Sequence, residues 1–347
     1  MNAFFTEKLE SWYASHRREL PWRDTADAYR IWISEIILQQ TRVAQGHDYY
    51  VRFVERFPDV VTLAEASEDE VLLLWQGLGY YSRARNLHKA AQMVCREYGG
   101  RLPGTFAELR RLPGVGDYTA AAIASFAYGE ASAVLDGNVY RVLSRYLGID
   151  TPIDTTKGQR EFRMLADEML DRRQPALYNQ AIMDFGALVC MPHALCEECP
   201  LCESCQAFRE GRVENLPVKS RTTQVKPLHL IYIYARAQGH LLLRRRGRQD
   251  IWKGLYEPLT QMPPGTEESL PSPVLLREGV KHQLTHRSIQ ADFYLWELPS
   301  RESLPSAWLQ EEGYRWVREE ERDDLATSRL VQELYKMVNK GPEYLGD

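Results

Sequence analysis

The sequence lacks the features of a membrane or secreted protein. No apolar run approaches the eighteen or so residues that a membrane-spanning helix needs. The first residues, MNAFFTEKLESWYASHRREL, are charged and amphipathic, whereas a signal peptide carries an apolar stretch and a small-residue cleavage site. We therefore expect a globular protein of the cytoplasm.

The sequence also has fewer positively charged residues than negatively charged ones. The chain holds 43 Lys and Arg residues against 48 Asp and Glu residues, a formal net charge of −5, and residues 1–217 alone carry −6. Such a chain has no general positive field. A polyanionic partner such as DNA would therefore have to be held by local donors.

Cysteine is scarce except in one place. Five of the six cysteines fall in the segment VCMPHALCEECPLCESC, and only Cys95 lies elsewhere. Disulfides this close together add little to a cytoplasmic chain, whereas several thiolates on one loop are what an iron–sulfur cluster or a zinc ion needs. The segment therefore predicts a metal centre and leaves both kinds open.

The length of 347 residues and the hydrophobic content of 44% are enough for about two domains. Up to residue 211, apolar residues recur at the spacing of helices, as in Leu87, Ala90 and Val94. Residues 212–227 have no such spacing and contain two prolines, which predicts a linker.

The remainder, residues 228–347, mixes two kinds of pattern. Short runs typical of strands, HLIYIYA, HLLLRRR, QADFYLWEL and YRWV, precede a closing helix that carries Leu330, Val331 and Leu334 on one face. The expected fold class is a multidomain α plus α/β protein, with an all-α domain followed by an α+β domain.

The segment ELRRLPGVGDYTAAAIASFAYG predicts a short helix, a tight hairpin and a second, alanine-rich helix. Gly114 and Gly116 allow the backbone to turn sharply, and their N–H groups at the start of the second helix suit a phosphate. The segment resembles a helix-hairpin-helix motif, whose phosphate contacts position a duplex without reading it. The alternative is an ordinary turn between helices with glycine caps.

The segment YRIWISEIILQQTR predicts a helix that is apolar almost all round, yet Glu35 lies in its middle. Burial favours the protonated form of a carboxyl group, which makes Glu35 a candidate general acid near neutral pH. The alternative is a pair with Arg30 or Arg42 at the helix rim, because buried glutamate is rarely unpaired. Gln39 and Gln40 are either capping amides or side chains that enter a base stack.

Two further motifs carry candidate site residues. In AVLDGNVYRVLSRY a strand-like stretch meets a helix, so Asp136 lies at the helix N-terminus with Asn138 near enough to orient it. A plain N-cap is the alternative. In GLGYYSRARN, Tyr80 and Tyr81 follow a tight turn and are either core residues or aromatics able to stack in an opened duplex.

Together, the motifs WISEIILQQT, GLGYYSRARNLHKAA, LPGVGDYTAAA, LDGNVYRVLSR and NQAIMDFGALVC resemble those of the MutY-type adenine DNA glycosylases. This family belongs to the helix-hairpin-helix, Fe–S glycosylase superfamily, which includes endonuclease-III-like enzymes. The resemblance spans residues 1–217. It continues more weakly into DIWKGLYEP and KHQLTHRSI, which are similar to the family's Nudix-like C-terminal domain.

The resemblance implies an architecture and an activity. Residues 1–211 would form the catalytic domain with a [4Fe–4S] loop, and residues 228–347 would form a Nudix-like domain that recognises 8-oxoguanine. The implied activity is monofunctional hydrolysis of the N-glycosidic bond of adenine mispaired with 8-oxoguanine or guanine. The implied partner is double-stranded DNA, bound by a monomer of the cytoplasm at the nucleoid.

The resemblance also implies catalytic roles. Glu35 matches the acid that protonates the departing adenine. Asp136 matches the aspartate that stabilises the oxocarbenium-like sugar or bonds to it transiently, and the pair parallels the two carboxyl groups of a glycosidase. Asn138 would hold Asp136, and Tyr118 would line the same pocket.

Contacts with DNA follow from the same resemblance. Gln40 and Tyr80 match positions that enter the duplex while the adenine is flipped out. Thr285, with His286 beside it, would bond to the damaged guanine. The alternative for His286 is a structural turn residue. The DNA-binding residues implied in this way are Gln40, Tyr80, Gly114, Gly116, Thr285 and His286.

The chain departs from the family pattern at the cysteines and at the C-terminal loop. Six residues commonly separate the first two cluster cysteines, but five separate Cys190 and Cys196, with His193 the one phosphate-binding candidate among them. The C-terminal loop reads Leu284–Thr285–His286 where many members have Phe–Ser–His, so a hydroxyl is kept. Cys202 is an extra thiol. The preferred ligands are Cys190, Cys196, Cys199 and Cys205, and the competing set is the C-x2-C run Cys196, Cys199, Cys202 and Cys205.

Three other functions fit the sequence less well. A glycosylase with lyase activity needs a Schiff-base lysine in GVG-x-K, where this chain has Tyr118. A Nudix hydrolase needs a helix dense in metal-binding glutamates, and REEERDD after Trp316 lacks the required spacing and glycines. A non-catalytic Fe–S DNA-binding protein would not need both Glu35 and Asp136.

Overall fold

The computed structural model describes residues 2–220, 224–247, 250–266 and 269–340. The chain divides into two compact units: residues 1–65 with 86–222, and residues 66–85 with 223–347. Part of the expected linker, residues 221–223, lies outside the described residues. The domain boundaries at residues 211 and 228 stay a prediction. None of the described helices is long and apolar enough to cross a membrane.

The described part of the first unit is helical, as the sequence predicts. Its α-helices are α1 (Asn2–His16), α2 (Ala28–Leu38), α3 (Val43–Arg56), α4 (Val60–Glu65), most of α6 (Ser82–Tyr98), α7 (Phe106–Leu109), α8 (Asp117–Tyr128), α9 (Gly137–Leu147), α10 (Thr156–Met169), α11 (Pro175–Leu188) and α12 (Gln206–Arg209). Three short 3₁₀ turns follow α11 and flank α12: η1 (Cys196–Glu198), η2 (Cys202–Ser204) and η3 (Val213–Asn215).

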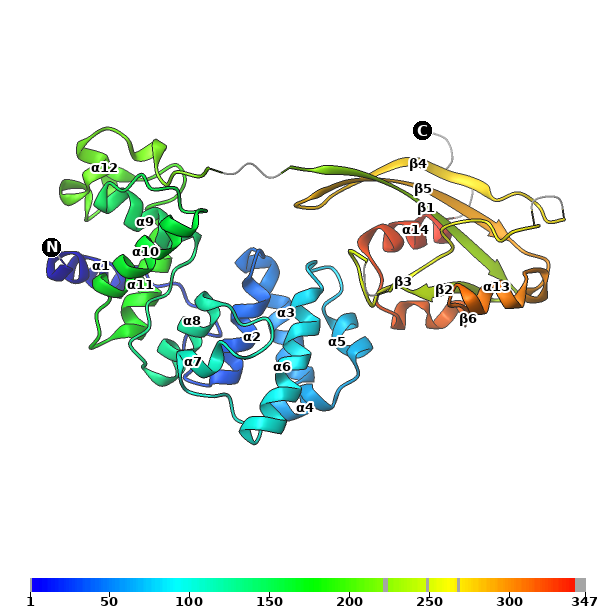
Figure 1. The fold of residues 1–347 in the computed structure, drawn as a ribbon, viewed down its shortest axis with the longest axis horizontal. Helices are drawn as coiled ribbons and strands as arrows, with labels where there is room; N and C mark the ends of the chain where they lie inside the picture. Colours follow the sequence, from blue (N-terminus) through cyan, green and yellow to red (C-terminus); the bar gives the residue numbers. More distant parts are fainter. Residues whose placement is uncertain (1, 221–223, 248–249, 267–268, 341–347) are drawn as a thin grey trace. The chain divides into compact units, whose positions relative to one another are not determined.

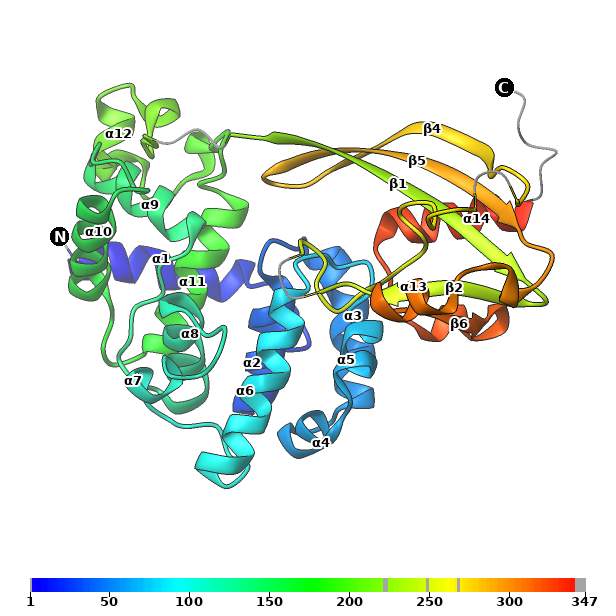
Figure 2. The same ribbon diagram turned by 45° about the vertical axis from the view of Figure 1, so that its right-hand side comes forward.

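The N-terminal helix packs among helices from much later in the chain. In Figures 1 and 2, α1 (blue) lies beside α11 and close to α9 and α10 (green). Phe5 and Leu9 of α1 are fully buried, and the Phe5 ring lies 4.6 Å from that of Tyr146 on α9. Burying a large apolar side chain contributes about 1.5–3 kcal/mol, so α1 is a structural part of this half of the unit.

Helix α8 joins the two halves of the first unit. It packs against α2 on one side and α11 on another. Its four alanines between residues 120 and 124 are fully buried, and their small side chains allow the neighbouring helices to approach closely. Helix α2 contributes Trp32 and Ile33, also fully buried. Candidate site residues on these helices are thereby fixed in position.

The second unit contains a mixed sheet. Its elements after residue 223 are β1 (Lys226–Ala237), β2 (His240–Arg245), β3 (Tyr256–Glu257), β4 (Val274–Gln283), β5 (Arg287–Glu297), η4 (Arg301–Ser303), α13 (Ser306–Glu311), β6 (Tyr314–Arg318), η5 (Glu319–Asp324) and α14 (Arg329–Lys340). The strand order is β3-β2-β1-β5-β4, and β6 pairs with β2. The long strands β1 and β5 are parallel, whereas β4 and β5 are antiparallel.

The sequence predicts most of these elements. The four expected strands correspond to β1, β2, β5 and β6, and the closing helix is α14, which buries Leu330, Val331 and Leu334 completely. The sequence pattern did not predict β3 or β4. Strand β4 is an edge strand of mostly exposed residues whose register with β5 shifts twice, so it has no clean alternation of apolar and polar side chains.

Residues 66–85 pack with the second unit through specific polar contacts. Arg245 of β2 pairs with Glu68 and Asp69 of α5 (Glu68–Leu74) at 3.0 and 2.7 Å. The Gln76 side-chain oxygen accepts a hydrogen bond from the Thr327 N–H at 2.7 Å. These contacts, made across a wide sequence separation, are why this segment belongs to the second unit.

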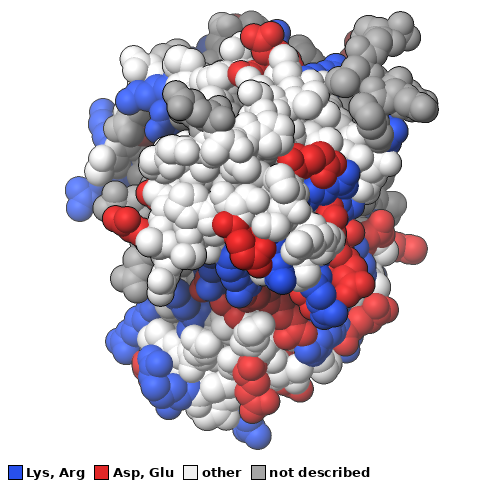
Figure 3. Space-filling view, turned by 90° about the vertical axis from the view of Figure 1, so that its right-hand side faces the viewer, with Lys and Arg blue, Asp and Glu red and all other residues white. Residues whose placement is uncertain are grey.

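Charges of both signs are interleaved on the surface. On the face drawn in Figure 3, many side chains are uncharged, and the Lys and Arg side chains lie among Asp and Glu side chains without forming a continuous basic field. This arrangement agrees with the net charge of −5. Binding of a polyanion to such a surface requires particular donors in particular places.

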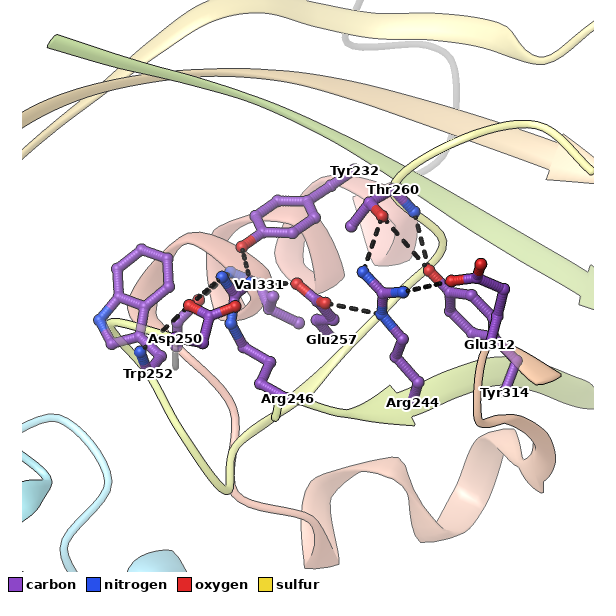
Figure 4. A network of polar contacts seen from close by, with 11 residues as sticks. Tyr232, Arg244, Arg246, Asp250, Trp252, Glu257, Thr260, Glu312, Tyr314 and Val331 are labelled. Atoms are coloured by element: carbon purple, nitrogen blue, oxygen red, sulfur yellow. Dashed lines mark hydrogen bonds and ion pairs between the residues drawn. The ribbon is translucent and has the colours of Figure 1, made fainter. Parts of the chain in front are cut away.

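A buried ionic network holds one end of the sheet together (Figure 4). Glu257 of β3, 2% exposed, accepts hydrogen bonds from Arg246 and, at 2.8 Å, from Arg244 of β2. Arg246 also pairs with Asp250 and donates to the Tyr232 hydroxyl at 3.1 Å. Two arginines thus share one carboxylate, so each charge in the interior has a partner.

The same network reaches the β4–β5 hairpin. The Arg246 guanidinium lies 5.4 Å from the Trp252 ring, and that ring lies 6.0 Å from the His282 ring near the end of β4. The segments DIWKGLYEP and KHQLTHRSI therefore meet in space at Trp252 and His282. A defect in the network should disturb the hairpin that carries Thr285.

We predict that Glu257→Ala destabilises the second unit by about 3–5 kcal/mol, because it leaves the buried Arg246 and the partly buried Arg244 without their shared carboxylate. Glu312→Ala is the matched control. Glu312 also pairs with Arg244, at 3.1 Å, but it is 34% exposed, so its loss should cost about 0–1 kcal/mol. Urea unfolding followed by circular dichroism measures both. Equal losses would show that the buried network does not hold the unit together.

Candidate active site and cysteine loop

Glu35 lies in the middle of α2 and is 7% exposed. One of its carboxyl oxygens accepts a hydrogen bond from the Tyr118 hydroxyl of α8 at 2.7 Å. Arg30, an expected partner if Glu35 were at the helix rim, instead lies 3.6 Å from Asp27. The geometry therefore places Glu35 in the interior between α2 and α8, and not at the helix rim.

Burial raises the pKa of Glu35 above its ordinary value. The hydrogen bond from Tyr118 and the charge of Arg23 oppose this effect, whereas the charge of Asp136 adds to it. Burial and the neighbouring Glu35 also raise the pKa of Tyr118, which keeps its hydroxyl protonated as a donor. Glu35 is thus a carboxyl group that retains its proton to higher pH than an exposed glutamate does.

Asp136 caps the N-terminus of α9, and its charge also acts on Glu35. Its carboxylate accepts hydrogen bonds from the N–H groups of Asn138 and Val139 at 2.9 and 2.8 Å and from the Asn138 amide at 3.0 Å. Burial raises the pKa of Asp136, and these three donors oppose that shift. The structure confirms the N-cap, and the catalytic role of Asp136 stays a prediction.

The two carboxyl groups differ in how well their ionised forms are stabilised. Asp136 accepts three hydrogen bonds and lies at a helix N-terminus, whereas the hydrogen bond described for Glu35 comes from Tyr118 alone. When two neighbouring carboxyl groups share fewer than two protons, the better-solvated one ionises first. The hydrogen bonds therefore stabilise the ionised form of Asp136 more than that of Glu35.

A chain of hydrogen bonds connects Asp136 with the cysteine loop. The Asn138 side chain that donates to Asp136 accepts from Arg141 at 2.8 Å, and Arg141 donates to the Cys190 carbonyl at 2.7 Å. Gly186 of α11 makes room for this chain, because a Cβ there would lie 2.7 Å from the Asn138 Cβ. The position of Asp136 thus depends on how the cysteine loop is held.

Sequence reasoning missed a second buried acidic residue near the pocket. Asp184 of α11 is fully buried and pairs with Arg18 and, at 2.9 Å, with Arg23. The Arg23 charge also acts on Glu35. The signal was present in NQAIMDFGALVC, where an aspartate interrupts an apolar helix just as Glu35 does.

The hairpin before α8 has the predicted sharp turn at Gly114, whereas Gly116 has an extended backbone that any residue can adopt. Gly114 has φ +77°, and a Cβ there would lie 2.7 Å from the Asn86 Cβ, so glycine is required for both reasons. Gly116 caps α8 and has open space where a Cβ would be. Among the described residues, no protein acceptor is assigned to the Gly114 or Gly116 N–H. Asp117, which would repel a phosphate there, is paired with Arg110.

Both residues expected to enter a duplex have strained backbones. Among the described residues other than glycine, only Gln40 (φ 57°), Tyr80 (φ 47°) and Gln238 (φ 51°) lie in the left-handed region. Gln238 is explained by the tight turn between β1 and β2. Gln40 and Tyr80 are exposed, whereas the adjacent Gln39 turns inward and donates to Thr119 at 3.1 Å. Strain at exposed side chains is typical of functional positions.

The second unit brings Tyr80 to the tip of the β4–β5 hairpin. The Tyr80 and Thr285 hydroxyl groups lie 2.5 Å apart, and Arg83 lies over the Tyr80 ring at 5.6 Å. Tyr81 is 6% exposed and is a core residue. His286 is exposed, and its carbonyl accepts from the Lys226 N–H at 3.1 Å. Two residues predicted from separate motifs thus meet at one place.

The cysteine loop forms a small apolar cavity. Its lining includes the thiol-bearing residues together with Arg145, and none of the described cysteines is in a disulfide. Arg145 is 3% exposed and donates to the carbonyl groups of Val213, Leu216, Met191 and Pro192 and to the Cys190 sulfur. Five cysteines line the cavity: Cys190, Cys196, Cys199, Cys202 and Cys205.

The donor set of this cavity fits a group held by thiolates. Soft sulfur ligands in apolar surroundings with a buried arginine nearby suit an iron–sulfur cluster. In the described part of the chain, however, no three His, Cys, Asp or Glu side chains converge as the ligands of a single metal ion. His193, the expected phosphate contact, is 99% exposed and lies 3.8 Å from Glu214. All five cysteines line the same cavity, so each is a candidate ligand.

The chain matches two known families. Residues 33–167 match the HhH-GPD superfamily of base excision DNA repair proteins, and residues 231–337 match the NUDIX domain. Among solved structures, a thermostable thymine-DNA glycosylase has a TM-score of 0.56 and 28% identity, covering 60% of this chain and 97% of that one. The fold is therefore that of a helical base excision repair protein with a Nudix-like domain after it, as the sequence predicts.

Comparison with relatives identifies the family within this class. An adenine DNA glycosylase of Buchnera aphidicola subsp. Schizaphis graminum is 34% identical over 254 residues, which cover 73% of each chain. An adenine DNA glycosylase of Mus musculus is 44% identical over 226 residues, 61% of this chain and 44% of the mouse protein. The chain belongs to the adenine DNA glycosylase family. It spans less than half the length of the mouse relative.

Proposed function

We propose that the protein is a monofunctional DNA glycosylase that hydrolyses the N-glycosidic bond of adenine opposite 8-oxoguanine or guanine. The observation that carries this proposal is a buried Glu35 with a raised pKa, held by the Tyr118 hydroxyl and acted on by the charge of Asp136. Membership of the adenine DNA glycosylase family supports the choice of base. The enzyme would act as a monomer on duplex DNA at the nucleoid.

The proposed reaction uses the two carboxyl groups differently. Glu35 donates its proton to a ring nitrogen of the adenine, so the base leaves with the electrons of the broken C1′–N bond and without negative charge. The sugar becomes oxocarbenium-like, and the Asp136 carboxylate faces it. Water then adds to C1′ and releases a proton, which restores Glu35. Tyr118 positions the Glu35 carboxyl group, and Asn138 positions that of Asp136.

The competing lyase function needs an amine to form a Schiff base. Tyr118 occupies the corresponding position, and its hydroxyl is committed to Glu35 with a raised pKa. Phenol oxygen does not form the imine from which β-elimination proceeds. The product is therefore an intact strand with an abasic site.

DNA would be bound by local donors. The N–H groups of Gly114 and Gly116 would hold a backbone phosphate at the start of α8. Gln40 and Tyr80 would occupy the space left in the stack when the adenine is flipped out, which costs a few kcal/mol of unstacking. Thr285, with His286 beside it, would contact the 8-oxoguanine on the opposite strand.

We also propose that the cysteine loop holds a [4Fe–4S] cluster through Cys190, Cys196, Cys199 and Cys205. A bound cluster would cross-link the loop and so fix the Cys190 carbonyl. Arg141 and Asn138 would transmit that rigidity to Asp136 through their hydrogen bonds.

We predict that Glu35→Gln and Asp136→Asn each lower adenine release at least 100-fold while duplex affinity changes little. The first substitution removes the proton and the second removes the charge facing the sugar, and acid–base catalysis typically contributes 100- to 10,000-fold. Glu55→Gln, on the exposed face of α3, is the control. Single-turnover assays on duplexes with A opposite 8-oxoguanine, G or T, with and without alkali, measure rate, selectivity and lyase activity together.

Two results would contradict this function. One is a folded, DNA-binding Glu35→Gln or Asp136→Asn variant that releases adenine at the wild-type rate. The other is strand cleavage without added alkali accompanied by an adduct that borohydride traps, which would establish a lyase.

We predict that Thr285→Val reduces the preference for 8-oxoguanine over guanine severalfold, since one hydrogen bond contributes about 1 kcal/mol. Thr285→Ser keeps the hydroxyl and should be nearly silent. Tyr80→Phe removes the Tyr80–Thr285 hydrogen bond and leaves the Thr285 hydroxyl. It therefore shows whether the effect of Thr285→Val comes from losing that hydrogen bond or from losing a contact with the base. Truncation near residue 218 is a poorer test, since residues 66–85 pack with the second unit. An unchanged rate ratio in Thr285→Val would assign recognition to other residues.

A further inference from the structure

The backbone of the cysteine loop repeats one turn three times. The Cys199 N–H bonds to the Cys196 carbonyl at 3.3 Å, the Cys202 N–H to the Cys199 carbonyl at 3.2 Å, and the Cys205 N–H to the Cys202 carbonyl at 3.2 Å. Two of these turns, η1 and η2, are 3₁₀ turns, in which side chains three residues apart lie on the same side. The regular spacing therefore brings Cys202 to the side that carries the neighbouring thiols.

The cavity confirms this placement. Cys202 lines it together with the four cysteines proposed as cluster ligands. The extra thiol is therefore part of the same site. Its neighbours in the lining are apolar or cysteine side chains and Arg145, including Val189, Leu195 and Phe208.

The five thiols fall into two groups. Cys190, Cys199 and Cys205 pack against the hydrophobic core of the first unit. Cys196 and Cys202 line the cavity but are not among the described side chains packed against that core. Core packing thus holds three of the thiols in place. The other two are both candidates for the fourth ligand position.

The short connection before Cys196 adds to this difference. Only five residues separate Cys190 from Cys196, and the Leu195 N–H is bonded to the Val189 carbonyl at 3.0 Å. Leu195 itself is 39% exposed. The position of Cys196 in the cavity therefore depends on the hydrogen-bonded segment before it, and not on packing against the core.

We propose that Cys202 is a reserve ligand of this site, which supplies the fourth thiolate when Cys196 does not. The proposal rests on the proposed [4Fe–4S] function of the loop. In the exchange, the iron–sulfur bond to Cys196 breaks and that sulfur takes up a proton. The Cys202 thiol gives up a proton to solvent as its sulfur bonds to the same iron. No electron is transferred.

The test measures iron and acid-labile sulfide in purified holoprotein variants. Wild type, Cys202→Ser and Cys95→Ser should each contain about four irons per chain. Cys196→Ser should keep at least half of the wild-type iron, and Cys196→Ser/Cys202→Ser should keep at least fivefold less than Cys196→Ser. Cys199→Ser, which removes a core-packed thiol, should lose the cluster although Cys202 is present.

Native alkylation with iodoacetamide, followed by mass spectrometry, gives a readout that does not depend on activity. In wild type, Cys202 should be modified while Cys190, Cys196, Cys199 and Cys205 are protected. In Cys196→Ser, Cys202 should become protected. Circular dichroism of each variant checks that it is folded.

The outcomes separate the two proposals. Wild-type protein without iron and sulfide would overturn the cluster and the reserve ligand together. Iron in Cys196→Ser as low as in the double variant, or equal alkylation of Cys202 in wild type and Cys196→Ser, would overturn the reserve ligand alone. Loss of the cluster in Cys202→Ser would also overturn it, since Cys202 would then be an ordinary ligand.

Discussion

The proposed chemistry requires a carboxyl group that keeps its proton and that is held in a fixed position. The hydrogen bond from Tyr118 to Glu35 bears on both requirements. A carboxyl group inside α2 resists ionisation, and Tyr118 holds it in one orientation at 2.7 Å. Tyr118 can do so because the alanine-rich face of α8 allows α2 to approach closely. Tyr118 also follows Gly116 by two residues, so the hairpin proposed to hold DNA sets the position of the same hydroxyl.

The second carboxyl group is positioned from another direction. Asp136 is fixed by the start of α9 and, through Asn138 and Arg141, by the Cys190 carbonyl. The cysteine loop lies outside the pocket, yet its geometry bears on the pocket through three hydrogen bonds. A cluster bound in the loop would therefore affect the position of Asp136 without contacting the substrate.

The sequence predicted those features that depend on local pattern. Glu35 was recognisable because a charge interrupts an apolar helix, and Gly114 because a sharp turn needs a left-handed residue. Features that depend on distant contacts were not predictable. Tyr80 and Tyr81 look alike in sequence, and only the fold shows that Tyr81 is buried. Strand β4 has the irregular pattern of an edge, and nothing local indicates that residues 66–85 pack with the second unit. The roles of Thr285 and His286 stay predictions.

The most direct test of the central claim is the pH dependence of single-turnover adenine release in Tyr118→Phe. The Tyr118 hydroxyl stabilises the ionised form of Glu35 and so lowers its pKa. Removing that hydroxyl should raise the pKa further, and the proton donor should persist to higher pH. The alkaline limb of the rate profile should therefore move to higher pH than in wild type. An alkaline limb that stays in place or moves to lower pH would show that Glu35, as held by Tyr118, is not the acid.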